Sequence, residues 1–233
     1  MIQPVRWHVY PNRSELAAAA AREIVNCARR KTGSSEHFRI VLVGGSTPRI
    51  VYSQLKHAAC DWALWQVYFG DERCYPPGDP QRNETMARQA WLDHVPIPDQ
   101  QIYPIATQLG AETAAADYAR VVGDMPAFDL VLLGLGEDGH TASLFPDQRI
   151  GFEANAPAAV AVHDAPKPPA DRVSLSAARL SQTNKLMFLI TGAGKRAAVK
   201  RWRDGQDIPA AQINPPVGVD VFITVDAAGP RLR

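Results

Sequence analysis

Short runs of residues that are apolar throughout, each ending in a polar or glycine-rich turn, constrain the fold of this chain most. Examples are the runs at 40–43 and 130–133, and segments with the composition of helices lie between the runs. A strand without polar alternation is buried on both faces, and such strands interleaved with helices form parallel sheets. The pattern predicts an α/β protein, a three-layer α/β/α sandwich around a mainly parallel, Rossmann-like sheet.

The expected elements cover most of the chain. We expect strands at 5–10, 40–43, 67–70, 130–133, 158–162, 173–175, 186–191 and 219–225. We expect helices at 14–31, from 47 or 48 onward, and at 84–94, 111–122 and 195–203. Asn83 is a plausible N-cap of the helix at 84–94. No internal repeat or low-complexity linker interrupts the pattern, so residues 1–233 are expected to form a single domain.

Composition excludes several classes of protein. The 25 basic residues nearly balance the 24 acidic ones, whereas binding to nucleic acid or to a membrane surface needs a basic excess or cluster. Cys27, Cys60 and Cys74 lack C-x-x-C spacing, which argues against a disulfide framework and fits a reducing compartment. No apolar run approaches the roughly 18–20 residues that span a bilayer, and the N-terminus lacks a signal-peptide pattern. We therefore expect a cytoplasmic protein.

Four of the expected strands end in chemically active residues. The strand at 40–43 leads into G-G-S-T-P, the strand at 67–70 into D-E-R, the strand at 130–133 into G-L-G-E-D-G-H, and the strand at 186–191 into G-A-G-K. In an open α/β sheet, ligands bind beyond the carboxyl ends of the strands. The four turns together predict one site.

The first of these turns has the composition of a phosphate-binding loop. Gly44 and Gly45 allow close approach of the backbone, the following helix offers free N–H groups, and Ser46 and Thr47 add hydroxyl groups. The alternative is an ordinary strand-to-helix turn in which Ser46 or Thr47 is the N-cap.

Two basic residues at strand ends are candidates to bind the same anion. Lys195 begins a helix after a glycine turn, and the alternative is a solvated lysine. Arg73 follows two carboxylates, so it either pairs with them or binds a phosphate.

Gly134, Gly136 and Gly139 match the dinucleotide fingerprint G-x-G-x-x-G. In a dinucleotide loop the pyrophosphate lies between the second and third glycines, where this chain has Glu137 and Asp138. Two negative charges beside a dianion argue against NAD binding.

The same segment suits proton transfer. His140 carries the side chain whose ordinary pKa lies nearest neutrality, and Asp138 is placed to accept a ring N–H or to face the substrate. The alternative is a capping aspartate beside an incidental surface histidine. The six histidines show no H-x-x-x-H or H-x-H spacing, so no metal site is expected.

Taken together, these segments resemble the 6-phosphogluconolactonase family, whose fold, the phosphosugar isomerase/CoA-transferase-like fold, also houses glucosamine-6-phosphate deaminases and ribose-5-phosphate isomerases. The resemblance runs from about residue 41 to 200. It is carried by GLGEDGHTASLFP at 134–146 and by VGGSTP, FGDER, DRVSLS and TGAGK in the expected order.

The resemblance implies a function and a set of site residues. The implied reaction is hydrolysis of 6-phospho-D-glucono-1,5-lactone to 6-phospho-D-gluconate in the oxidative pentose phosphate pathway, with no cofactor. His140 would be the base that activates water, Asp138 would orient it, and Asp71 would contact sugar hydroxyls or assist proton transfer. The implied phosphate and substrate contacts are Gly44, Gly45, Ser46, Thr47, Arg73, Arg172 and Lys195, with Asn83 as a weaker one.

The chain differs from the usual family sequence at two positions, and two other functions are alternatives. The family usually has valine where this chain has Cys74 and serine where it has Arg82. Deaminases typically carry D-E-Y and I-A-F-N where this chain has D-E-R and T-A-S-L, which favours the lactonase. A non-enzymatic sugar-phosphate sensor normally adds a DNA-binding segment, for which 233 residues leave little room.

Overall fold

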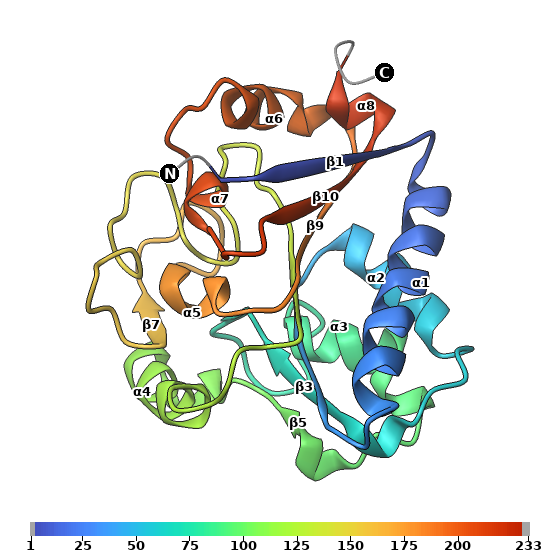
Figure 1. Cartoon of the computed structure of the whole chain (residues 1–233). Helices are drawn as coiled ribbons and strands as arrows, with labels where there is room; N and C mark the ends of the chain where they lie inside the picture. Colours follow the sequence, from blue (N-terminus) through green and yellow to red (C-terminus); the bar gives the residue numbers. More distant parts are fainter. Residues whose placement is uncertain (1–2, 230–233) are drawn as a thin grey trace.

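A computed structural model describes residues 3–229. Within them, seven strands form a parallel sheet, confirming the predicted α/β class (Figure 1). Across the sheet the order is β1 (Val5–Tyr10), β10 (Val219–Thr224), β9 (Leu186–Ile190), β6 (Leu130–Leu133), β2 (Phe38–Leu42), β3 (Trp65–Phe69) and β5 (Ile102–Tyr103). Every residue of β6, β9 and β10 is buried, as expected for strands covered on both faces.

Helices cover both faces of the sheet. The α-helices are α1 (Arg13–Thr32), α2 (Ser46–Leu55), α3 (Asn83–Ala90), α4 (Ala111–Val122), α5 (Ala177–Ser181), α6 (Arg196–Arg203), α7 (Pro209–Gln212) and α8 (Val225–Ala228). Short 3₁₀ helices are η1 (Trp62–Leu64), η2 (Leu92–His94), η3 (Asp99–Gln101), η4 (Thr107–Leu109) and η5 (Ala193–Lys195). Figure 1 shows α1, α2 and α3 on one side of the strands and α4, α5 and α7 on the other.

Helix α1 shows why these segments fold as the sequence predicts. The Asn12 side chain accepts the Glu15 N–H at 2.9 Å and caps the first turn. Leu16, Ala20 and Ile24, spaced four residues apart, have no exposed surface. This stripe packs α1 onto the sheet.

A second, antiparallel sheet was not expected. It consists of β4 (Asp71–Arg73), β8 (Arg172–Leu175) and β7 (Ala159–Val162), in that order. Apolar runs show that strands are buried but not which sheet they join. In β4, Asp71 pairs with Ser174 and Arg73 with Arg172, so this small sheet carries residues of the predicted site.

The predicted start and end of the third helix were wrong. Arg82, not Asn83, is the N-cap of α3, and its side chain makes no capping hydrogen bond. The Glu72 carboxylate on β4 accepts the backbone N–H groups of Asn83 and Glu84 instead. The helix ends at Ala90, and residues 92–94 continue as η2.

The buried apolar side chains of the described chain form one cluster, from Leu16 to Ala228. Among residues 3–229, no helix combines the length and the apolar character needed to cross a membrane. The single-domain organisation stays a prediction.

Candidate active site

A cavity of about 460 Å³ opens at the carboxyl ends of β2, β3, β6 and β9. It brings together residues from all four predicted turns and from β8. The predicted site residues that line it are Gly44, Gly45, Ser46, Thr47, Asp71, Arg73, Asn83, His140, Arg172 and Lys195. Asp138 is not in the lining and instead bonds to His140.

His140 and Asp138 form a hydrogen-bonded pair. Nδ1 of the imidazole lies 2.6 Å from Oδ1 of Asp138. A carboxylate acceptor places the proton on Nδ1, so Nε2 keeps its lone pair. The His140 side chain is 23% exposed, and its burial lowers the pKa of the imidazole against the opposing effect of Asp138. The ring is therefore neutral near pH 7 and can act as a base.

Glycines make this loop possible. A Cβ at Gly136 would lie 2.1 Å from Nδ1 of His140 and 2.5 Å from Oδ1 of Asp138. Gly139 has φ of +92°, a conformation that favours glycine. No helix occurs in residues 134–152, all of which the structure describes, so the loop lacks the helix of a dinucleotide fold.

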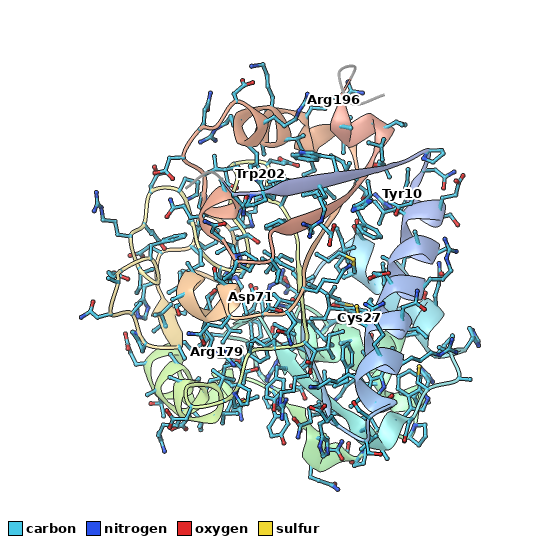
Figure 2. The ribbon with its side chains drawn as sticks, in the orientation of Figure 1. Tyr10, Cys27, Asp71, Arg179, Arg196 and Trp202 are labelled. Carbon is cyan, nitrogen blue, oxygen red and sulfur yellow. The ribbon has the colours of Figure 1, made fainter. Side chains whose placement is uncertain are left out.

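Asp71 anchors a second group of polar residues. It is 5% exposed, and its carboxylate accepts the Ser143 hydroxyl at 2.7 Å and the Asn83 amide at 3.1 Å. The same amide donates to the Asp71 carbonyl at 2.8 Å. A Cβ at Gly44 would lie 1.8 Å from Oδ1 of Asn83, so this position of Asn83 requires a glycine at residue 44. Figure 2 shows Asp71 among the side chains at the centre of the molecule.

The glycine loop leads directly into α2. The N-cap is Gly45, with φ of +118°, so the alternative in which Ser46 or Thr47 caps the helix is wrong. The Thr47 hydroxyl lies 2.6 Å from that of Thr191 instead. Without a capping side chain, the first N–H groups of α2 remain for an anion.

The three predicted cations differ in their surroundings. Arg73 donates from Nη1 to the Gln81 carbonyl, and its buried Nε has no partner among the described residues. Lys195 is half-buried in the cavity wall and is among the charges that act on His140.

Arg172 is buried, lines the cavity and donates hydrogen bonds to a neighbouring loop. Its Nη2 donates to the Lys167 carbonyl at 2.8 Å and to the Pro168 carbonyl at 3.3 Å, and its Nε donates to the Pro169 carbonyl at 3.3 Å. Arg172 thus supports the loop at 167–169, part of which lines the cavity.

Several lining or supporting residues were missed by the sequence reasoning. They are Tyr75, Gln81, Ser143, Phe145, Lys167 and Thr191. Ser143 and Phe145 lie inside the segment 134–146, and Thr191 directly precedes G-A-G-K. The place of these three residues in the sequence, next to predicted site residues, could therefore have indicated them. Nothing in the sequence indicated Lys167, because its position in the structure depends on the conformation of a proline-rich loop. Residues 3–229 contain no cluster of three or more side chains suited to hold a metal ion.

A parallel α/β sheet with a neutral histidine, carboxylates and a glycine loop at its carboxyl edge defines an α/β enzyme with a polar small-molecule site. Residues 11–222 match the family model of glucosamine-6-phosphate isomerases/6-phosphogluconolactonase. The human 6-phosphogluconolactonase is 34% identical in an alignment that covers 94% of this chain and 91% of the human protein.

Solved structures agree with this match. The 6-phosphogluconolactonase from Trypanosoma brucei is 27% identical with a TM-score of 0.86, covering 98% of each chain. The enzyme from Thermotoga maritima shows the same fold, with a TM-score of 0.88 at 23% identity, covering 95% of this chain and 100% of its own. The chain belongs to the glucosamine-6-phosphate isomerase/6-phosphogluconolactonase family.

Proposed function

We propose that this chain is a 6-phosphogluconolactonase, a lactone hydrolase of the pentose phosphate pathway that converts 6-phospho-D-glucono-1,5-lactone to 6-phospho-D-gluconate. The curated relatives at about 34% identity over most of the chain support this activity. The structural observation that carries the proposal is the His140–Asp138 pair, at 2.6 Å, beside a cavity that also contains the glycine loop.

The phosphate end of the substrate provides the anchor. The N–H groups at the start of α2 and the side chains of Arg73 and Lys195 supply donors and positive charge around one cavity. Arg172 contributes through its remaining nitrogen, Nη1. Binding a remote, unreactive group in this way orients the lactone carbonyl toward His140.

His140 then acts as a general base. Nε2 takes a proton from water as the water oxygen bonds to C1 of the lactone, and Asp138 stabilises the imidazolium that forms. The bond from C1 to the ring oxygen breaks, and the imidazolium returns its proton to that oxygen. The products are the open-chain acid and neutral His140, with no covalent enzyme intermediate and no cofactor.

Asp71 has a different role in this scheme. Its carboxylate already accepts from Ser143 and Asn83, so it is held in one orientation, from which it orients sugar hydroxyls or the attacking water. We also propose a cytoplasmic location, in keeping with the free thiols of Cys27, Cys60 and Cys74.

A lactonase assay on freshly generated 6-phosphogluconolactone, corrected for spontaneous hydrolysis, tests the proposal. Hydrolysis above the background is expected. A parallel assay for ammonia release from glucosamine 6-phosphate tests the deaminase alternative. Ammonia release without lactone hydrolysis would contradict the proposed function.

A further inference from the structure

We infer that Glu72 is a positioning residue for this reaction, whose buried carboxylate fixes the first turn of α3 and thereby holds Asn83 against Asp71. The inference rests on the proposed function. Glu72 has no exposed surface and does not line the cavity, but it lies on β4 between two residues that do, Asp71 and Arg73.

The carboxylate of Glu72 accepts three backbone N–H groups. Oε1 accepts from Asn83 at 2.7 Å and from Arg73 at 2.9 Å, and Oε2 accepts from Glu84 at 2.9 Å. Helix α3 receives no capping bond from its own N-cap residue, Arg82. The start of the helix is therefore tied to β4 by a side chain eleven residues earlier in the chain.

Asn83 connects the hydrogen bonds of Glu72 to the cavity. Its backbone N–H is held by Glu72, and its side-chain amide donates to the carbonyl and the carboxylate of Asp71. The backbone N–H and the side-chain amide of Asn83 thus bond to Glu72 and Asp71, which are neighbours on β4. If the first turn of α3 shifts, the amide moves away from Asp71, and the carboxylate loses one of the two donors that orient it.

A buried arginine supplies the opposite charge. Arg82 is 2% exposed, and its Nε lies 3.6 Å from Oε2 of Glu72. Its Nη2 donates to Oε2 of Glu84 at 3.0 Å and to the Ile105 carbonyl at 2.9 Å. The chain thus has a largely buried group of one cation and two carboxylates beneath the site. Helix capping alone needs only a neutral oxygen, whereas this carboxylate also fixes the backbone of Arg73.

A double-mutant cycle tests the inference. The proteins compared are the unaltered chain, Glu72→Gln, Asn83→Ala and the double variant. Glutamine places an NH₂ group against one of the backbone donors, so Glu72→Gln should lower kcat/KM about 10- to 100-fold, as expected for loss of a charged hydrogen-bond acceptor. In the Asn83→Ala background the same change should cost no more than about 2-fold, because residues that act through one another are not additive.

Glu84→Gln is the matched control. Glu84 lies in the same turn and pairs with the same Arg82, but its side chain bonds to no cavity residue, so kcat/KM should stay within about 2-fold of the unaltered chain. Melting temperatures show which variants fold. If Glu72→Gln does not fold, Glu72→Asp, which withdraws the carboxylate by one methylene, takes its place in the cycle.

Additive losses in the cycle, or unaltered kinetics in a folded Glu72 variant, would overturn the inference. Calorimetric titration of the same four proteins with 6-phosphogluconate measures the coupling through affinity, independently of turnover. An unaltered chain that binds this ligand but does not hydrolyse the lactone would contradict the proposed function. The coupling between Glu72 and Asn83 would still be decided by the affinities.

Discussion

One oxygen of Asp138 accepts two hydrogen bonds from His140: Oδ1 lies 2.6 Å from the ring Nδ1 and 3.1 Å from the backbone N. The residue that orients the ring thus also fixes the backbone from which the ring projects. Burial opposes ionisation of Asp138, but the hydrogen bonds from His140 hold its pKa below its ordinary value. The carboxylate is charged throughout the range in which His140 titrates, so it stabilises the imidazolium formed during the reaction.

Asp138→Asn should lower kcat roughly 10²–10⁴-fold, because the amide keeps the shape of the carboxylate but not the charge that stabilises the imidazolium. Affinity for 6-phosphogluconate should change little, since Asp138 does not line the cavity. Turnover and calorimetric titration measure the two effects. A variant that loses affinity but keeps its kcat would show that Asp138 faces the ligand instead of His140.

The value of kcat/KM should fall at acid pH as His140 is protonated. Because burial lowers its pKa, the midpoint should lie below the ordinary value of 6.5. In Asp138→Asn the midpoint should move lower still, since Asp138 is the main cause that raises this pKa. The free energy of unfolding should also rise with pH between the pKa of His140 in the folded chain and 6.5. In this range the unfolded chain binds more protons than the folded chain.

The same profile should carry a second titration. Burial raises the pKa of Glu72 to about 7, against the backbone hydrogen bonds and Arg82 that favour its charged form. In the unaltered chain, kcat/KM should begin to fall near pH 7 and fall again below 6.5. Glu72→Gln should leave only the lower step. A profile with one identical step in both proteins would show that protonation of Glu72 does not affect turnover.

Arg73→Ala and Lys195→Ala should each lower kcat/KM for the phosphorylated lactone. A charge-assisted hydrogen bond to a dianion contributes about 1.5–3 kcal/mol, or roughly 10–150-fold. Hydrolysis of plain gluconolactone should be little affected, whereas His140→Ala should slow both substrates. If the two cation variants slow both lactones equally, these residues do not recognise the phosphate.

Gly44→Ala should impair the site more than the fold. The added Cβ would lie 1.8 Å from Oδ1 of Asn83, so the amide must leave its place on Asp71. We expect a loss of kcat/KM about as large as that of Asn83→Ala, with a melting temperature close to that of Asn83→Ala. A Gly44→Ala variant with unaltered kinetics would show that Asn83 can move without cost.

Much of the fold could be predicted because it depends on local patterns. The limits of α4 and β6 follow from composition and from an unbroken apolar run, and the carboxyl ends of the parallel strands define the site. The second sheet could not be predicted, since an apolar run such as β8 does not show whether it will join the parallel strands or pair with β4.

The residues that support the site were hidden for a similar reason. Thr47 bonds to Thr191, 144 residues away, and Asp71 to Ser143, 72 residues away. Single-residue chemistry indicates which groups can act, but long-range pairing decides which of them are held in place. Glu72 is the clearest case: it lies between two residues of the predicted site, but its carboxylate bonds to the backbone of Asn83, eleven residues away.

Asp220→Asn should destabilise the edge of the sheet. Asp220 on β10 has a side chain that is 7% exposed, accepts from Arg6 Nε at 2.8 Å and His8 Nε2 at 2.9 Å on β1, and lies 3.3 Å from Lys185 Nζ. Removing its charge should lower the free energy of unfolding at pH 7 by roughly 1–3 kcal/mol, at the lower end if solvent screens the half-exposed Arg6.

The pH dependence of this loss distinguishes a charge effect from a packing effect. Burial opposes ionisation of Asp220, but the bonds from Arg6 and His8 hold its pKa well below the ordinary 3.8. Its contribution is therefore complete above 3.8 and is lost as the pH falls toward the folded pKa. Urea unfolding of Asp220→Asn and of the unaltered chain gives the difference in their free energies of unfolding. This difference should be the same at pH 7 and pH 5 and should become smaller below pH 4. Asp124→Asn, at an exposed position, is the control. If both variants lose the same stability, or if the Asp220 difference persists in acid, the ion pair does not hold β1 to the sheet.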